Sequence, residues 1–267
     1  MVGTDFETVR WSFDRDSGIG RLVIDRPEKH NAISEQVAEE LGAGLDAFEA
    51  VDEDADQAIV RAVIIEGAGE ASFSSGADIS EFPDVDPAQS ELPRIWDDAI
   101  QQFAPPVIAK IDGICFAGGF EIALASDFRI ASRRSTFAMK ESNIGIYPGA
   151  GGTQRLSLLV GPSRAKELCM TAEEISGEQA LEEGIVDYVY PADRLEAEVR
   201  QFAEQIADRP PLAVRAIKDV VDNSLETGLA EGRKYEFRRN RLLFASKDAD
   251  IGIEAFLEGR EPEWRGE

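Results

Sequence analysis

Two glutamates beside glycine-rich segments are the residues of this chain best suited to acid–base chemistry. Glu121 stands in the sequence GGFE, three residues after Gly118, where the pattern predicts the start of a helix. Free N–H groups at the positive end of a helix can bind a developing oxyanion, and a carboxylate in the first turn would lie beside it. Glu141 follows the predicted strand TFAMK and precedes the turn PGAGG. The plainer interpretation of Glu121 is an acidic residue that the helix dipole favours at a helix start. The plainer interpretation of Glu141 is one more acid in an acidic protein.

The chain lacks the residues that most other catalytic chemistries require. His30 is the only histidine, and its loop, DRPEKHNA, carries no nucleophile motif, which disfavours a Ser-His-Asp or Cys-His site. No cluster of Cys and His has zinc spacing, so we expect no metal. The segment PGAGGTQR lacks the Lys of a phosphate-binding P-loop and the third glycine of a dinucleotide fingerprint. Carboxylates and backbone N–H groups are the chemistry that remains.

The segment SSGAD, residues 74–78, is a second possible source of backbone donors. Small residues in a loop at the end of a strand let the backbone approach a ligand closely. An ordinary surface loop is the alternative interpretation.

Composition excludes several partners. The chain has 267 residues, of which 43% are hydrophobic, enough for a sizeable core. Acidic residues number 52 against 28 basic ones, giving a net charge of −24 that is spread along the chain. This pattern is typical of proteins that stay soluble in very high salt, whereas a cationic partner would need a localised acidic patch. Nucleic acids and anionic membranes are disfavoured because both need clustered Lys and Arg.

Cysteine usage and hydropathy predict a cytoplasmic location. Cys115 and Cys169 both have apolar neighbours in the sequence, as expected of small core residues in a reducing compartment. No apolar run is long enough to span a bilayer, and no secretory signal is visible.

The spacing of apolar residues predicts an α/β N-terminal part followed by a mostly helical part. The first part is expected to contain a hairpin over 7–25, a helix capped by Ser34, buried strands at 61–67 and 105–113, a loop at 73–80, helices near 91–103 and at 118–126, and strands at 127–131 and 136–140. After Gly149, helices are expected at 152–170, 176–183, 192–207, 211–225, 229–245 and 249–258, with one strand at 185–191.

Five ordered motifs together resemble the crotonase, or enoyl-CoA hydratase/isomerase, superfamily. They are IDRPEKHNAIS, FSSGADIS, CFAGGFEIALASDFRIA, KESNIGIYPGAGGTQRL and FLEGREPEW. The resemblance implies an α/β spiral of ββα units, here residues 1–200, and a helical C-terminal region for trimerisation, residues 201–267. Trimers of this family pair into hexamers, so a homotrimer or homohexamer is expected.

The resemblance implies an enzyme acting on acyl-CoA thioesters, most similar to a 2-enoyl-CoA hydratase of fatty acid metabolism. An enoyl-CoA isomerase is an alternative, although isomerases of the family commonly keep only the second glutamate. A non-catalytic binding protein is a third class, against which the net charge and both glutamates argue. Coenzyme A would enter as part of the substrate, with no further cofactor.

The resemblance also implies roles by position. Ala77 and Gly118 match the residues whose N–H groups form the oxyanion hole, and Glu121 and Glu141 match the two glutamates of the hydratases. The positions that match substrate contacts are Glu28, Lys29, His30, Ala32, Ser75, Asp78, Ile79 and Gly149. Two positions depart from the family pattern: Lys140 stands where many relatives have Pro, and Ser80 where many have a Lys near a phosphate.

Overall fold

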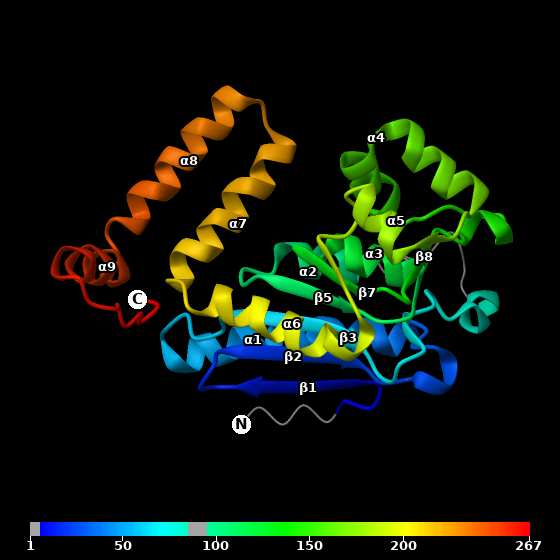
Figure 1. Ribbon diagram of the computed structural model, residues 1–267, viewed down its shortest axis with the longest axis horizontal. Helices are drawn as coiled ribbons and strands as arrows, with labels where there is room; N and C mark the ends of the chain where they lie inside the picture. The colour runs from blue at the N-terminus through cyan, green and yellow to red at the C-terminus, as the bar shows by residue number, and fades with distance from the viewer. Residues whose placement is uncertain (1–5, 85–94) are drawn as a thin grey trace.

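A computed structural model describes residues 6–84 and 95–267 of the chain (Figure 1). Within this part the strands form a six-stranded and a four-stranded sheet. In spatial order the larger sheet contains β1 (Val9–Asp14), β2 (Ile19–Ile24), β3 (Ala62–Gly67), β5 (Val107–Ile111), β7 (Phe128–Ser132) and β10 (Tyr188–Tyr190). The smaller sheet contains β4 (Ser72–Ser74), β6 (Ile114–Phe116), β8 (Thr136–Ala138) and β9 (Ile175–Ser176).

Successive turns of the chain add one strand to each sheet. β3, β5 and β7 are parallel neighbours in the larger sheet, and β4, β6 and β8, which follow them directly in sequence, are parallel neighbours in the smaller one. The β1–β2 pair is the antiparallel hairpin that the sequence predicts, with Val9 opposite Ile24. This arrangement confirms the predicted α/β spiral of ββα units.

Helices follow the strands in the positions that the apolar spacing indicates. Their bounds are α1 (Glu35–Ala55), α2 (Ile95–Gln102), α3 (Gly118–Ala125), α4 (Gly152–Thr171), α5 (Gly177–Glu182), α6 (Ala192–Ala207), α7 (Pro211–Glu226), α8 (Leu229–Leu243) and α9 (Lys247–Glu258). Short 3₁₀ turns occur at η1 (Pro27–Lys29), η2 (Ile79–Asp84) and η3 (Glu141–Ile144). Ser34 caps α1 as expected, because its hydroxyl accepts the Val37 N–H at 3.2 Å. Of the helix expected near 91–103, residues 91–94 lie outside the described part.

Four elements differ from the sequence expectation. β6 and β9 were not predicted, because strands of three and two residues are too short to show a period of two. The loop expected at 73–80 contains the end of β4 and the start of η2. The helix expected at 152–170 is interrupted at Gly161, whose φ of 78° and ψ of 161° are not helical, and Pro162 then starts the helix again.

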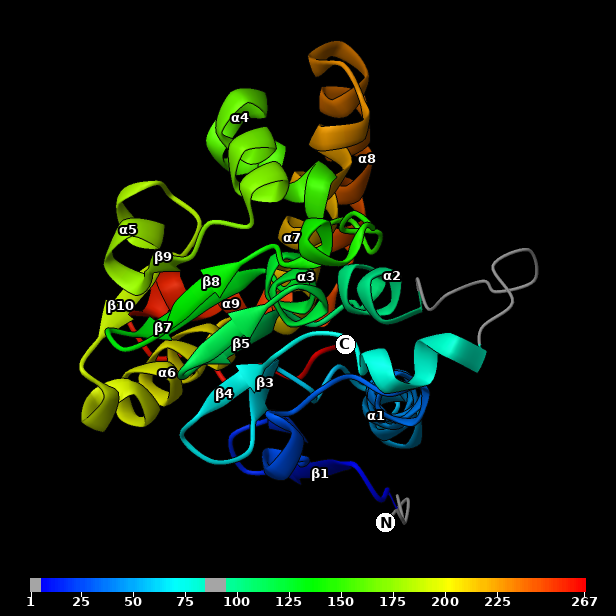
Figure 2. The ribbon, with the colours of Figure 1, turned by 90° about the vertical axis from the view of Figure 1, so that its right-hand side faces the viewer.

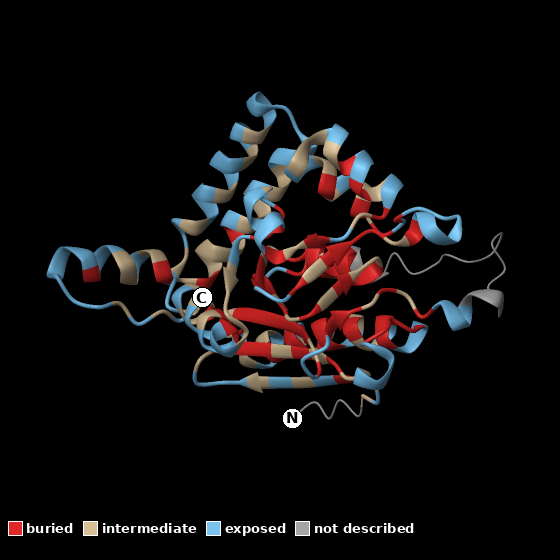
Figure 3. Cartoon of the chain, turned by 45° about the vertical axis from the view of Figure 1, so that its right-hand side comes forward, coloured by how far each residue is buried: buried red, intermediate tan, exposed pale blue. Residues whose placement is uncertain are grey.

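Apolar side chains cover both faces of the larger sheet, which is why β3 reads as a continuous apolar run. On one face Val63 and Ile65 join a core with Leu41 and Phe48 of α1. On the other face Ile64 packs with residues of α6, namely Leu195, Val199 and Ala203. Figure 3 shows the buried residues gathered in the sheets and in the helices that lie on them.

The C-terminal helices α7, α8 and α9 extend away from the sheets (Figure 1) and are mostly exposed or half-buried (Figure 3). Several large apolar side chains in these helices and just after α8 are exposed, namely Ile217, Val221, Leu225, Leu229, Phe237, Leu242, Phe244, Ile253, Phe256 and Leu257. The predicted boundary at residue 200 falls inside α6 and stays a prediction. Among the described residues, no helix combines the length and the apolar character needed to cross a membrane.

Candidate active site

Helix α3 begins with a strained turn that fixes where its first N–H groups point. Ala117, the residue before the helix, has φ 49° and ψ −124°, a conformation that an L-residue adopts only when its surroundings enforce it. Its N–H donates to the Ala138 carbonyl at 2.9 Å, and its carbonyl accepts the Glu121 N–H at 3.0 Å. Gly119 allows close packing here, since a Cβ on it would lie 2.6 Å from Ser74 at the end of β4. Figure 2 shows α3 beside α2, with β5 close by.

The structure brings together the two segments that carry the predicted oxyanion-hole residues, Ala77 and Gly118. Ile33 forms a parallel bridge to Ala77 by bonding the Gly76 carbonyl and the Asp78 N–H, both at 2.8 Å. In such a bridge the N–H of Ala77 points away from Ile33. Gly76 lies against the start of α3, because a Cβ on it would be 3.1 Å from the nitrogen of Gly118. Within residues 6–84 and 95–267, neither Ala77 nor Gly118 donates its N–H to a backbone acceptor.

Glu121 is held by the glycine turn that precedes α4. Its side chain is almost fully buried at 3% exposure. Its Oε1 accepts the N–H of Ala150 at 2.8 Å and that of Gly152 at 3.0 Å. The glycine turn, which lacks the motif of a phosphate-binding loop, therefore binds an anion of the same chain, the Glu121 carboxylate. The sequence analysis missed this contact, because nothing in either segment shows that they meet.

Glu141 has a contrasting environment. It opens η3, is buried at 8% exposure, and its Oε2 has no hydrogen-bond partner among the described residues. Burial raises the pKa of Glu141 to about 7, and the nearby charge of Glu121 acts in the same direction. A buried acceptor without a partner is costly unless a bound molecule completes its hydrogen bonding. A carboxyl that titrates near neutral pH can both donate and accept a proton.

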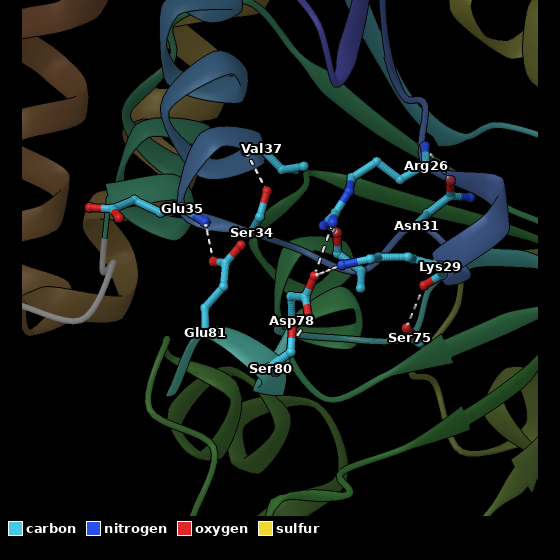
Figure 4. A network of polar contacts seen from close by, with 11 residues as sticks. Arg26, Lys29, Asn31, Ser34, Glu35, Val37, Ser75, Asp78, Ser80 and Glu81 are labelled. Atoms are coloured by element: carbon cyan, nitrogen blue, oxygen red, sulfur yellow. Dashed lines mark hydrogen bonds and ion pairs between the residues drawn. The ribbon is translucent and has the colours of Figure 1, made fainter. Parts of the chain in front are cut away.

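Two of the predicted substrate contacts, Lys29 and Ser75, lie near a third, Asp78 (Figure 4). Oδ2 of Asp78 accepts hydrogen bonds from Arg26 and Lys29, each at 2.9 Å, and Oδ1 accepts the Ser80 hydroxyl at 2.5 Å. The Ser80 hydroxyl, with Lys29 and Arg26, holds the pKa of Asp78 well below its usual range, although burial opposes this. The Asp78 carboxylate therefore holds Arg26, Lys29 and Ser80 in place, and we call this group the Asp78 anchor. Ser80, at the position where many relatives have Lys, uses its side chain within this group.

The other predicted contacts surround this anchor, with one exception. Glu28, Lys29 and His30 are exposed, and the Ser75 N–H donates to the His30 carbonyl at 3.0 Å. Ala32 is buried, and its carbonyl accepts Arg26 Nη1 at 2.8 Å. Ile79 is 59% exposed, unusual for an isoleucine next to a buried Asp. Gly149 belongs to the separate turn before α4 and is exposed, and a Cβ on it would lie 3.9 Å from the Tyr147 carbonyl oxygen.

Sequence reasoning missed two residues that hold this segment in shape. Arg26 bonds Asp78 and the Ala32 carbonyl, as described above. Asn31, fully buried with φ 54°, donates from Nδ2 to the carbonyls of Ala68 at 3.0 Å and Ser72 at 2.7 Å. Both lie in the motif IDRPEKHNAIS, but their inward direction is visible only in three dimensions.

The comparisons agree with this fold. The chain belongs to the enoyl-CoA hydratase/isomerase family, whose model matches residues 14–267. It is 34% identical over 254 residues to the probable mitochondrial enoyl-CoA hydratase of Dictyostelium discoideum, covering 94% of this chain and 89% of that one. It is 34% identical over 263 residues to carnitinyl-CoA dehydratase of Citrobacter koseri, covering 95% and 97%. An enoyl-CoA hydratase subunit of Geobacillus kaustophilus superposes with a TM-score of 0.90 at 36% identity, covering 99% and 100%.

Proposed function

We propose that this chain is a 2-enoyl-CoA hydratase, which adds water across the 2,3 double bond of an enoyl-CoA thioester to give a 3-hydroxyacyl-CoA. The observation that carries the proposal is a pair of buried carboxyls, one tied to backbone N–H groups and one with an unpartnered oxygen. Two further points support the proposal. The two carboxyls stand at the positions that match the two glutamates of the hydratases, and enoyl-CoA hydratases are among the relatives of this chain.

The backbone N–H groups of Ala77 and Gly118 would bind the thioester oxygen. Addition of water at Cβ places negative charge on that oxygen, so donors that are already aimed at it stabilise the transition state. Losing one such donor typically costs about 3–4 kcal/mol. The strained Ala117 and the bridge at Ile33 support this role, because they would hold the two donors in place before the substrate arrives.

The two glutamates would divide the proton transfers. Glu121 orients and activates the attacking water, and Glu141 is the main proton-transferring residue. Overall, the hydroxyl of the water bonds to Cβ and a proton bonds to Cα, so no electrons leave the substrate and no redox cofactor is needed. Because the two carboxyls interact, their apparent pKa values belong to the pair.

Coenzyme A would bind along the Asp78 anchor. Glu28, Lys29, His30, Ser75 and Ile79 offer exposed or half-buried groups there, and Lys29 supplies a positive charge. Gly149, with no side chain, would leave room for the acyl chain at the turn before α4. The acyl length is left unassigned, because much of the pocket segment near 80–100 lies outside the described residues.

An enoyl-CoA isomerase is the second candidate, since the family name covers both reactions. Keeping both Glu121 and Glu141 favours hydration, because double-bond migration needs no second carboxylate for water. The test is to incubate the purified protein in molar salt with crotonyl-CoA and, separately, with a 3-enoyl-CoA. We expect loss of the enoyl thioester absorbance with crotonyl-CoA. Isomerisation of the 3-enoyl-CoA without hydration of crotonyl-CoA would overturn the hydratase proposal.

Assembly into a homotrimer or homohexamer in the cytoplasm completes the proposal. The exposed apolar side chains of α7, α8 and α9 support assembly, as does an apolar cavity of about 290 Å³ between these helices, lined by Leu212, Phe244, Ile253 and Trp264 among others. Cys115 and Cys169 are free thiols, as expected in a reducing compartment. The net charge of −24 supports adaptation to high salt.

A further inference from the structure

The turn that holds Glu121 is itself held by Arg155, in the first turns of α4. Nη1 of Arg155 donates to the Ala150 carbonyl at 3.2 Å. Nη2 of the same guanidinium donates to the side-chain oxygen of Gln101 on α2. Arg155 therefore joins two helices to the one backbone segment whose N–H groups bind a catalytic carboxylate.

The order of peptide groups shows why this contact matters for Glu121. The N–H groups that bind Glu121 belong to the peptides 149–150 and 151–152. The carbonyl that Arg155 binds belongs to the peptide between them, 150–151. The carbonyl of Gly151, in peptide 151–152, is fixed separately by the N–H groups of Gln154 at 3.1 Å and Arg155 at 2.9 Å.

The Arg155 contact restrains a turn that is intrinsically flexible, because the turn contains glycine. Gly151 has φ 81°, a conformation that glycine adopts without strain, and it can also leave that conformation at little cost. Because the 151–152 peptide is held by its own carbonyl, a change in φ at Gly151 would alter the angle between the 149–150 and 151–152 peptides. Their two N–H groups would then no longer both point at Glu121. A donor that moves by about 1 Å at a catalytic group can cost about 100-fold in rate.

We propose that Arg155 is a positioning residue that acts on catalysis through Glu121, by locking the 150–151 peptide so that both N–H groups stay aimed at the carboxylate. This inference rests on the proposed hydratase function. Arg155 does not need to touch the substrate. Its removal should therefore lower kcat far more than it changes KM.

The test is a double-mutant cycle in turnover. Arg155→Met removes the guanidinium but keeps most of the length of the side chain. We expect it to lower kcat for crotonyl-CoA hydration by about 10- to 100-fold, with KM changed by less than about 3-fold. In a Glu121→Gln background the same substitution should cost less than about 3-fold, because residues that act as one unit are not additive.

Arg164→Met is the matched control. Arg164 also lies on α4 and is partly buried, and it pairs with Glu167, Glu173 and Glu183. Its loss should lower thermal stability while kcat stays within about 2-fold of the unaltered enzyme. Arg155→Lys should recover part of the activity lost in Arg155→Met, because Lys keeps one donor for the Ala150 carbonyl.

Gln101→Met keeps the inference testable if Arg155→Met does not fold. It releases only the far end of the guanidinium, so we expect a smaller kcat loss that again disappears in the Glu121→Gln background. An equal fold-loss from Arg155→Met or Gln101→Met in both backgrounds, with the unaltered enzyme active, would overturn the positioning role. An unaltered enzyme that does not hydrate crotonyl-CoA would overturn the proposed function and this inference with it.

Discussion

Gly152 and Glu121 fit each other through both the backbone and the missing side chain of the glycine. The Gly152 N–H donates to Glu121 Oε1 at 3.0 Å, and a Cβ on Gly152 would lie 2.8 Å from the same oxygen. The glycine is thus required twice, for its donor and for the space beside it. The same Cβ would also lie 3.0 Å from Met139, so the carboxylate has little room to move aside.

Gly152→Ala should therefore displace the Glu121 carboxylate and lower hydration turnover by at least about 10-fold. Steady-state kinetics with crotonyl-CoA would measure this loss. Gly42→Ala is the control, because a Cβ at Gly42 in α1 would meet no atom of the described residues within 4 Å. The control should keep full activity and gain up to about 1 kcal/mol of stability from helix propensity. Normal turnover in Gly152→Ala would show that the placement of Glu121 is not critical.

Stability should depend on pH through Glu141. Because burial raises its pKa from 4.5 to about 7, the ionised form is disfavoured in the folded protein. Between these values the unfolded chain loses the proton first, so stability falls as pH rises and levels off above pH 7. Glu141→Gln does not titrate. Its free energy of unfolding, measured by denaturant titration, should rise relative to that of the unaltered protein from pH 5 to pH 8, by up to about 3 kcal/mol.

The comparison should be made in one molar-salt buffer series, so that screening is constant. Glu121→Gln serves as a second reference, since the charge of Glu121 contributes to the raised pKa of Glu141. A difference between Glu141→Gln and the unaltered protein that is the same at pH 5 and pH 8 would contradict the raised pKa.

Removing the Gly118 N–H should lower activity severely. Gly118→Pro takes away one of the two proposed oxyanion donors at the first position of α3, where a helix tolerates Pro best. A loss of about 100- to 1,000-fold in turnover is expected from a single donor. Circular dichroism identifies the informative case, a variant that is still folded. A folded and fully active Gly118→Pro protein would mean that the oxyanion hole lies elsewhere.

Assembly should depend on salt. Each added subunit brings a further net charge of −24, so association is opposed in dilute buffer. At ~1 M salt the Debye length falls to roughly 3 Å, which removes most long-range repulsion. Light scattering and hydration assays across a salt series should show a trimer or hexamer in molar salt that loses assembly and activity together on desalting. A stable, active monomer at any salt concentration would rule out the assembly, and unchanged behaviour in dilute buffer would rule out salt adaptation.

Elements with a long apolar period could be predicted from sequence, and short or non-local features could not. The apolar stripe of α1, which contains Val37, Leu41, Leu45 and Phe48, is buried as expected. It could be predicted because its spacing follows the period of a helix with one buried and one exposed face. β6 has only three residues and depends on pairing with β4 and β8, which sequence spacing does not show.

The candidate site follows the same division. The motif matches gave the positions of Ala77, Gly118, Glu121 and Glu141. The structure places Gly76, the neighbour of Ala77, against Gly118 and buries both carboxyls. The contact from Ala150 to Glu121 joins residues 29 positions apart. It arises from the packing of α3 against α4, which no local pattern encodes.

The central claim is that two carboxylates carry out hydration at this site. The most direct measurement is the turnover of crotonyl-CoA by Glu121→Gln and by Glu141→Gln, with the affinity of each variant for a CoA thioester measured separately. Each substitution keeps the size of the side chain but removes its ability to exchange a proton. We predict that each lowers turnover by at least ~100-fold while thioester binding changes little. Near-normal turnover in both variants would contradict the two-carboxylate mechanism.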